Sequence, residues 1–572
     1  MTARLLSETV PHIPQTSNIY DTDNDKRKYE IVKGYIQHNW NPFTVIQMRA
    51  IITGILLELD FERFEALLSK TLTIDRDKLK NNLADLEPEY RDFHSKISAY
   101  KSLTEETQRE IDHKKEEAWH IYFDLLPTAC AKIKNVLQEK LGAGAYTALY
   151  QKVGDNIRAS GVADDEKFNP EKIFTLSRIA NQLIKVVRSR SATGTAFVVL
   201  DAIRNPFEAL FFHQRYANFY LVSINTPNDE RLKHLRGSHK FSEQQIEALD
   251  KKEYPKKLSG KDIYVSQNIQ KCIEISDIHI NNPHREPFNT NDLSSQLLWY
   301  ISLITHPGLL TPTSMERGMQ IAYSAKLNSG CISRQVGAVV TDSTYSVKAV
   351  GWNSTPEGQT PCILRSATAL LKGGEEFVYS SYERTNAEFH KVMEHTFTRD
   401  ITNSNALKGR PLPYCFKDIQ NEVEDEKNQV HTRSLHAEEN AFLQITKYGG
   451  QAIKGGILFT TASPCELCSK KAYQLGIEKV VFIDPYPGIS REHILNSGSN
   501  APELILFRGS IGRAYHRLYM PLLPIKDELR MLTGFSIGGG KIAEGREARI
   551  VALEKENNEL KARLAEAEAR RG

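Results

Sequence analysis

Apolar residues in the first quarter of the chain recur three and four positions apart. The clearest run consists of Met48, Ile51, Ile52, Ile55, Leu56 and Leu59. This spacing places apolar side chains on one face of a helix. Between residues 78 and 117 the apolar positions are sparse and the charges are mixed, which is typical of solvated helices. The pattern therefore predicts a helix-rich region over residues 1–140.

From residue 141 to residue 300, short apolar runs alternate with helical segments. Residues 195–201 and 218–224 have the length and composition of strands, whereas residues 173–187 and 206–216 keep the helical spacing. Strands that alternate with helices favour a parallel sheet. We therefore expect an α/β domain over residues 141–300.

A second α/β pattern covers residues 311–535. It opens with a helical segment whose apolar positions are Met315, Met319, Ala322 and Leu327. Further helices are expected around His436 and from Pro464 onward, because proline is favoured in the first turn of a helix. The predicted strands are residues 336–341, 347–352, 455–461, 479–483 and 504–507.

The last segment, residues 541–572, follows a glycine triplet that is typical of a flexible joint. Its apolar positions have coiled-coil spacing, with Asn557 at an a-type position that can fix register. The positions are Ile550, Leu553, Asn557, Leu560 and Leu564. A helix of about three heptads is only marginally stable by itself. An oligomerising coiled coil, an engineered appendage and a frayed helix therefore all remain open.

Composition narrows the function classes. The chain of 572 residues has 40% hydrophobic and 25% charged residues, an ordinary globular composition. Its 74 basic and 71 acidic residues leave a net charge of +3, which gives no reason to expect bulk nucleic-acid binding. Seven cysteines do not suggest a disulfide framework, and no stretch has membrane-spanning length. A cytoplasmic location without membrane contact is the expectation.

The chemistry of the chain is concentrated at His436, Glu438, Cys465 and Cys468. One imidazole and two thiolates supply the three protein ligands of a catalytic zinc site, which keeps a fourth position open. Glu438 lies two residues after His436 and is placed to move a proton beside the metal. The order H-x-E, then P-C-x-x-C, is the signature of zinc-dependent nucleobase deaminases. A closed structural zinc site would need a fourth ligand, and none follows Cys468 closely.

The run that ends at Asp201, followed by Arg204, resembles the Walker-B region of P-loop nucleotide kinases. The sequence contains no G-x-x-x-x-G-K-[ST] loop, so it lacks the backbone cradle and the lysine that hold phosphates. We interpret residues 141–300 as a degenerate P-loop-NTPase-like domain that serves in regulation or assembly of the protein. A plain scaffold is the alternative.

Two further motifs carry a family resemblance. Cys331 and Arg334 precede V-G-A-V at residues 336–339, and residues 351–358 are G-W-N-S-T-P-E-G. With the zinc motifs, they resemble the deoxycytidylate deaminase family over most of residues 315–485. Trp352 and Ser354 stand where the family usually has Tyr and Gly. The resemblance implies an α/β fold class overall, with a cytidine-deaminase-like three-layer α/β/α domain that binds Zn²⁺ and hydrolyses cytosine at C4.

Four residues are candidates for substrate binding. By resemblance, Asn353 orients the sugar hydroxyl or the base; otherwise it is a turn residue. Arg334 offers a fork of donors to a phosphate, or forms a structural salt bridge. Ala437 presents its backbone N–H to the pyrimidine edge, and Tyr486 stacks on the base or packs in the core.

About 80 residues separate the second predicted strand of this domain from His436. Such a length indicates a lid, an allosteric surface or an oligomer surface. The insertion contains Cys362, His390, His395 and Cys415. A second zinc site is conceivable because some family members have one, but these spacings fit no standard finger.

The layout is similar to bacterial two-domain antiviral deaminases, in which a P-loop-like domain precedes a deoxycytidylate-deaminase domain. That resemblance implies conversion of dCTP and dCMP to dUTP and dUMP, which depletes the dCTP pool on phage infection. It also implies a homo-oligomer, dTTP or dCTP as allosteric effector and, in some members, an inhibitory small RNA. Alternatives are a housekeeping dCMP deaminase of dTMP synthesis, a polynucleotide cytidine deaminase, and an inert binding module.

Overall fold

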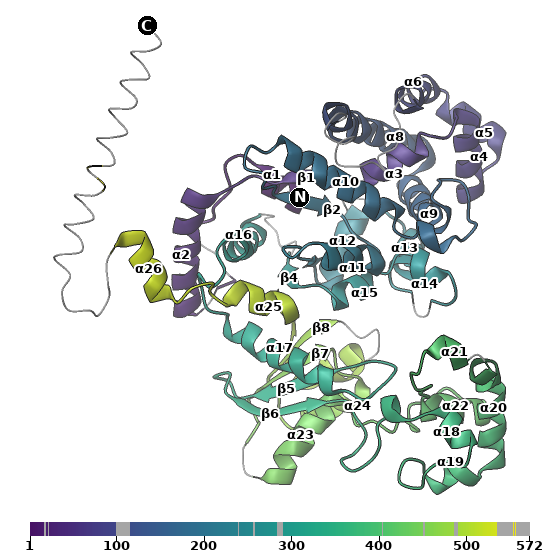
Figure 1. The fold of residues 1–572 in the computed structure, drawn as a ribbon, viewed down its shortest axis with the longest axis vertical. Coiled ribbons are helices and arrows are strands. Elements are labelled where there is room, and N and C mark those ends of the chain that lie inside the picture. The colour runs from purple at the N-terminus through teal and green to yellow at the C-terminus, as the bar shows by residue number, and fades with distance from the viewer. Residues whose placement is uncertain are drawn as a thin grey trace. The chain divides into compact units, whose positions relative to one another are not determined.

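The computed structural model describes most of the chain (Figure 1). Outside the description are residues 16–18, 21, 99–114, 238–239, 256–257, 283–289, 403, 450–451, 485–489, 535–552, 554 and 556–572, and the side chains of residues 229, 399–402, 404, 491 and 492. The chain divides into two compact units. The larger is Met1–Leu298 with Pro312–Tyr515, and the smaller is Trp299–Thr311 with His516–Gly572.

The larger unit begins with helices, as the apolar spacing predicts. They are α1 (Thr2–Ser7), α2 (Asp23–Asn39), α3 (Met48–Leu56), α4 (Phe61–Leu72), α5 (Arg76–Leu83), α6 (Glu87–Ser98), η2 (His120–Leu125), α8 (Leu126–Leu141), α9 (Ala145–Ser160), η3 (Pro170–Lys172) and α10 (Thr175–Arg190). One hydrophobic core joins η2 and the α-helices from α3 to α10, with buried members from Ile46 to Phe212. Residues on both sides of position 140 belong to this core. The division at that position stays a prediction.

The region after α10 contains both predicted strands, but in different sheets. Strand β2 (Val198–Asp201) pairs in parallel with β1 (Thr44–Gln47), and β3 (Val222–Asn225) pairs in parallel with β4 (Ile278–Asn281). The expectation of one sheet containing both runs was therefore wrong. The partner of β2 is β1, which the sequence pattern did not reveal. Strand β1 is four residues long and continues directly into α3, so its apolar residues merge with the helical pattern.

The helices of this region alternate with the strands, and a third strand joins β4 from far along the chain. The helices are α11 (Pro206–Arg215), α12 (Asn228–Gly237), α13 (Glu243–Glu253), α14 (Asp262–Val265), α15 (Ile269–Glu274) and α16 (Asn291–Thr305). Strand β10 (Gly509–Ser510) lies antiparallel to β4. The P-loop-like character of residues 141–300 stays a prediction.

A five-stranded mixed sheet forms the second α/β part of this unit, in the order β6-β5-β7-β8-β9. Strand β5 is antiparallel to both of its neighbours, and β7, β8 and β9 are parallel. All five strands were predicted within two residues of their bounds. They are β5 (Gly337–Thr341), β6 (Val347–Trp352), β7 (Ile457–Ala462), β8 (Lys479–Asp484) and β9 (Glu503–Leu506).

Helices cover both faces of this sheet (Figure 1). Val339 and Phe459 pack with α17 (Ser314–Ala325), whereas Ala338 and Leu458 pack with α23 (Ala437–Tyr448) and α24 (Glu466–Gln474). Neighbouring residues of a strand point to opposite faces, so one run of apolar residues fills two cores. The arrangement is a three-layer α/β/α fold.

Two glycines of the family-like motifs allow these helices to approach the sheet. A Cβ atom on Gly337 would lie 2.0 Å from the carbonyl oxygen of Ala322 in α17, and a Cβ atom on Gly351 would lie 2.3 Å from that of Ala437 in α23. Both neighbours are helix backbone, which cannot turn aside. The two motifs therefore contain glycine at these positions because of packing on opposite faces of the sheet.

The insertion ahead of His436 is a small helical subdomain with its own core, made of Ala367, Leu370, Tyr379, Phe389, Met393, Tyr414 and Ile419. Its elements are η5 (Cys362–Leu364), α18 (Ala367–Leu371), α19 (Ser381–Thr385), α20 (Ala387–Thr402), α21 (Ser404–Leu407) and α22 (Phe416–Val423). Arg365 and Glu383, both fully buried, form an ion pair inside it. The Arg365 guanidinium lies over the rings of Tyr379 and Tyr414, 5.2 and 4.9 Å from their centroids.

The smaller unit contains the end of α16, the end of α25 (Gly512–Tyr519) and α26 (Ile525–Thr533). A hydrogen bond of 2.6 Å joins His306 and Glu528 within it. The predicted coiled-coil tail falls outside the described residues, apart from Leu553 and Lys555. Within the described ranges, none of the helices combines the length and the apolar character needed to span a bilayer.

Candidate active site

The candidate site lies at one edge of the five-stranded sheet. Gly337, the first residue of β5, is opposite Trp352, the last of β6, and Ala462 at the end of β7 is beside Asp484 at the end of β8. Because β5 runs against β6 and β7, its start and their ends share one edge. The segments that contain Arg334, Asn353 and the two zinc-motif cysteines therefore come together there.

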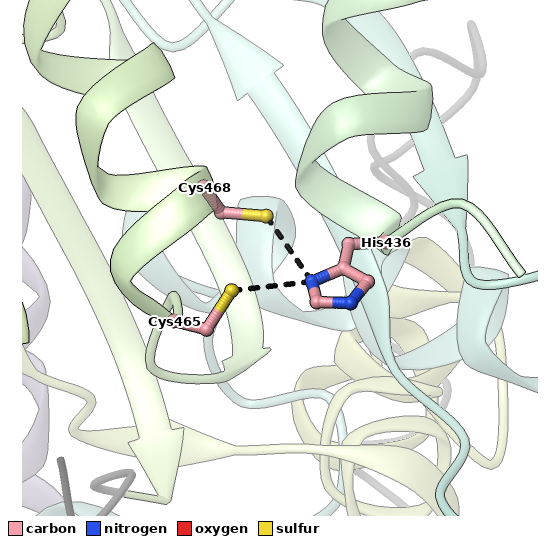
Figure 2. Close-up of side chains that lie close together, drawn as sticks. All are labelled: His436, Cys465 and Cys468. Carbon is pink, nitrogen blue, oxygen red and sulfur yellow. Dashed lines mark hydrogen bonds between the residues drawn. The ribbon is translucent and has the colours of Figure 1, made fainter. Parts of the chain in front are cut away.

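Two helix starts place the predicted zinc ligands. His436 is the N-cap of α23, Cys465 is the N-cap of α24, and Cys468 follows in the first turn of α24. Figure 2 shows the three side chains converging, with Nδ1 of His436 at 3.3 Å from the Cys465 Sγ and 3.4 Å from the Cys468 Sγ. The predicted helix around His436 and the helix after Pro464 are both present.

The geometry of this group fits zinc. With Zn–S bonds of about 2.3 Å and a Zn–N bond of about 2.0 Å, tetrahedral angles put nitrogen and sulfur about 3.5 Å apart. The observed distances of 3.3 and 3.4 Å match this spacing. The three ligand atoms lie within 4.8 Å of one another and, among the described residues, no fourth His, Cys, Asp or Glu joins the group. Three protein ligands leave a position open, as in catalytic sites.

The two thiol groups of the zinc motif interact with each other. The Cys468 thiol donates to Cys465, which lowers the pKa of Cys465 to about 3 and raises that of Cys468. The hydrogen bond to Cys465 also raises the pKa of His436. The lowered pKa of Cys465 favours metal binding, because thiolate is the form that coordinates zinc.

Glu438 is buried beside these ligands, in the first turn of α23. The Thr460 hydroxyl, on β7, lies 2.9 Å from its Oε1 and donates to it. Burial removes the carboxylate from water and raises the pKa of Glu438. A raised pKa makes the carboxylate a stronger proton acceptor, which is the property of a general base.

Residues that the motifs did not single out hold the two helices in place. Glu439 accepts a hydrogen bond of 3.4 Å from the His436 backbone N–H and forms an ion pair with Lys471 of α24. The Asn440 side chain donates to the Trp352 carbonyl oxygen at 2.9 Å, which ties α23 to the end of β6. Glu439 lies three residues after the helix cap, which is the spacing of a capping box, so the sequence alone could have indicated its role. Thr460 had no local signal.

Asn353 lies at this edge and is nearly buried. Its Oδ1 accepts from the Val336 N–H and its Nδ2 donates to the Arg334 carbonyl oxygen, both at 2.7 Å. The amide therefore joins the end of β6 to the segment before β5. Its role in orienting the sugar or the base stays a prediction.

Arg334 lies at the same edge, in an ion pair with Asp484 and at 3.4 Å from Oε1 of Glu274. The salt-bridge alternative describes the contacts seen here, and phosphate binding stays a prediction. Ala437 is buried as the first residue of α23, where a backbone N–H has no partner inside the helix. Tyr486 lies outside the described residues.

The cysteines and histidines of the insertion do not form a comparable group. Among the described residues, the cluster close enough to share a metal is that of His436, Cys465 and Cys468. Cys362 is buried in the subdomain and Cys415 is half-buried. The insertion supplies packing, with no second group of metal ligands among its described residues.

Comparisons with known proteins agree with the geometry. Residues 312–484 match the family model of the cytidine and deoxycytidylate deaminase zinc-binding region. A deoxycytidylate deaminase of Enterobacteria phage T4 is 25% identical over 170 residues, which are 29% of this chain and 76% of that protein. One from Schizosaccharomyces pombe is 28% identical over 185 residues, 32% of this chain and 41% of that protein.

A solved structure is also similar to part of the chain. It is dCMP deaminase from the cyanophage S-TIM5 in complex with dCMP and dUMP, at 23% identity and a TM-score of 0.21. The match covers 35% of this chain and 99% of that chain.

Proposed function

Because residues 312–484 belong to the cytidine and deoxycytidylate deaminase family, we propose that the chain deaminates free deoxycytidine nucleotides by zinc-dependent hydrolysis. The observation that carries the proposal is the convergence of His436, Cys465 and Cys468 beside the buried carboxyl group of Glu438. The reaction replaces the C4 amino group of cytosine by oxygen from water and releases ammonia.

His436, Cys465 and Cys468 would hold Zn²⁺, which supplies a Lewis acid that activates water. Glu438 accepts a proton from the attacking water and delivers it to N3 of the base; it then accepts the remaining proton from the hydroxyl group formed at C4 and delivers it to the leaving amine, which departs as ammonia. The Thr460 hydroxyl orients the carboxyl group through Oε1. In this proposal the Ala437 N–H, at the start of α23, binds the pyrimidine edge.

For the substrate, we propose dCMP and dCTP. Arg334 is the candidate phosphate ligand and Asn353 the candidate for the sugar or the base, since both lie at the sheet edge that contains Glu438 and the zinc ligands. The near-neutral charge of the chain, +3 in 572 residues, favours a free nucleotide over a polynucleotide, which needs a basic channel.

The test measures ammonia release from deoxycytidine, dCMP, dCTP and single-stranded DNA by purified protein, with zinc content determined in parallel. Glu438→Gln should reduce turnover by at least about 10³-fold, because it removes the proton carrier, and should retain one zinc per chain. Thr446→Val, which changes an exposed turn of α23, is the matched control. Near wild-type turnover by Glu438→Gln would contradict the mechanism.

We further propose that the activity lowers the dCTP pool in the cytoplasm during phage infection. The support is the resemblance of the layout, with an α/β region lacking a phosphate loop ahead of the deaminase domain. A homo-oligomer, a dTTP or dCTP effector and an inhibitory small RNA are part of the same proposal. Infected cells should lose dCTP with the wild-type chain and keep it with Glu438→Gln. Equal dCTP pools would reject the pool-depletion role.

A further inference from the structure

A polar pocket opens at the sheet edge next to the candidate active site. Its volume is about 340 Å³, which is within the range of small-ligand sites. One wall is made of residues 333–335, ahead of β5, and of Thr461 and Ala462 at the end of β7. Thr460, whose hydroxyl contacts Glu438, is the neighbour of Thr461 in the same strand. Because neighbouring residues of a strand face opposite sides, Thr460 and Thr461 lie on opposite faces of β7, and the pocket meets the candidate site at the strand end, where Ala462 lines the pocket three residues before Cys465.

The opposite wall comes from outside the region that matches the deaminase family model. Lys271 and Glu274 of α15 line the pocket, and α15 precedes residue 312, where that match begins. Gln270, also of α15, donates to Asp484 at 3.3 Å. The N-terminal region thus completes a pocket at the edge of the deaminase sheet.

Cations from three separate segments line this pocket: Lys271, Lys326 and Arg334. Glu274 bridges two of them, with Oε2 at 2.7 Å from the Lys271 Nζ and Oε1 at 3.4 Å from Arg334. Arg334 also pairs with Asp484. Three positive charges are thus balanced by two carboxylates. The carboxylate oxygens accept hydrogen bonds from N–H groups that phosphate oxygens could accept from instead.

Lys326 is the cation with the strongest reason to bind an anion. Its Nζ lies over the Tyr323 ring, 4.6 Å from the centroid, and burial lowers the pKa of this ammonium group. A partly dehydrated ammonium group gains more from a nearby negative charge than one in water does. A phosphate in the pocket would supply that charge.

We infer that the pocket receives the phosphate chain of the deoxycytidine nucleotide, with Lys271 and Lys326 binding the phosphates beyond the first. Glu274 holds Lys271 and Arg334 in place until those phosphates replace it. This inference rests on the proposed function, and it makes α15 a determinant of phosphate-chain length. A monophosphate reaches Arg334, whereas a triphosphate also uses the cation on α15.

The experiment compares steady-state kinetics of the full-length, zinc-loaded protein on deoxycytidine, dCMP and dCTP. Lys271→Gln should raise KM for dCTP about tenfold, the value of one charge-assisted hydrogen bond, and change KM for dCMP less than about twofold. Glu274→Gln should lower KM for dCTP, a gain that misfolding cannot produce. Lys479→Gln is the matched control because Lys479 starts β8, at the opposite edge of the sheet. Equal effects of Lys271→Gln on dCMP and dCTP, or none, would overturn the inference.

Binding of the products dUMP and dUTP, measured by calorimetry, separates this inference from the proposed function. A chain that turns over no substrate yet loses dUTP affinity in Lys271→Gln supports the pocket while the catalytic proposal fails. An active chain whose dUTP affinity is unchanged in Lys271→Gln retains the catalytic proposal and rejects the pocket. If Lys271→Gln lost dTTP binding but kept its KM for dCTP, the inference would also be rejected, because the pocket would then bind an effector triphosphate and not the substrate.

Discussion

Gly351→Ala tests whether the approach of α23 to β6 sets the geometry of the zinc site. The new Cβ atom would lie 2.3 Å from the Ala437 carbonyl oxygen, 2.4 Å from the Ala441 nitrogen and 2.9 Å from the Ala441 Cα. All three atoms are backbone of α23, which begins directly after His436 and contains Glu438. The substitution adds one methyl group and removes no functional group.

The clash is large enough to move the helix. Contacts of a Cβ atom below 3.0 Å essentially never occur, so α23 would have to recede by at least about 0.7 Å. Overpacking of this kind costs about 1–3 kcal/mol of stability. A displacement near 1 Å in a catalytic group reduces turnover by about 10²-fold. Stability should therefore fall modestly and kcat/KM steeply.

The assay combines thermal unfolding, zinc content and ammonia release from dCMP. Gly34→Ala is the matched control, because Gly34 lies in the interior of α2 and its Cβ would meet no atom within 4 Å. There alanine should stabilise the helix by up to about 1 kcal/mol and leave activity unchanged. If Gly351→Ala kept wild-type zinc content, unfolding temperature and kcat/KM, the contact between α23 and β6 would not control the site.

Two further predictions concern stability. Burial lowers the pKa of His279 from 6.5 to about 4, so the unfolded chain binds more protons between those pH values. The free energy of unfolding should therefore be highest above pH 6.5 and should fall by up to about 3 kcal/mol as the pH falls to 4. In His279→Gln this part of the pH dependence, measured by urea unfolding, should vanish. An unchanged pH dependence in the variant would contradict the prediction. Arg365→Met leaves Glu383 buried without its main partner and should cost about 3–5 kcal/mol in thermal or urea unfolding, part of which Arg365→Met with Glu383→Gln should recover. A loss below about 1 kcal/mol would show that Arg433 and Tyr414, which also contact Glu383, suffice.

Local patterns explain why the deaminase sheet was predicted well. Strand β6 has the predicted bounds, residues 347–352, and the buried strands β7 and β8 were recognised from short apolar runs. The two zinc-motif cysteines are three residues apart on one helix start, and Glu438 lies two residues after His436. Such spacings act within one turn or one strand, so they depend little on the rest of the fold.

The contacts that join distant segments could not be predicted in the same way. Strand β1 pairs with β2 across about 150 residues, and its four residues have no periodicity separate from that of α3. Glu439 meets Lys471 of another helix, and Thr460 meets Glu438 from a strand. Each pairing depends on how whole elements pack, and single-residue types in the sequence do not encode it.

The sequence by itself determined the candidate zinc ligands, the candidate proton carrier and the alternation of strands and helices around them, because each is a local spacing of residues with a defined chemistry. Only the tertiary structure decided what Arg334 contacts. Its partners Glu274 and Asp484 are 60 and 150 positions away and reach it because α15 and the end of β8 meet at one sheet edge. Charge pairing of this kind follows from three-dimensional proximity, which the order of residues does not reveal.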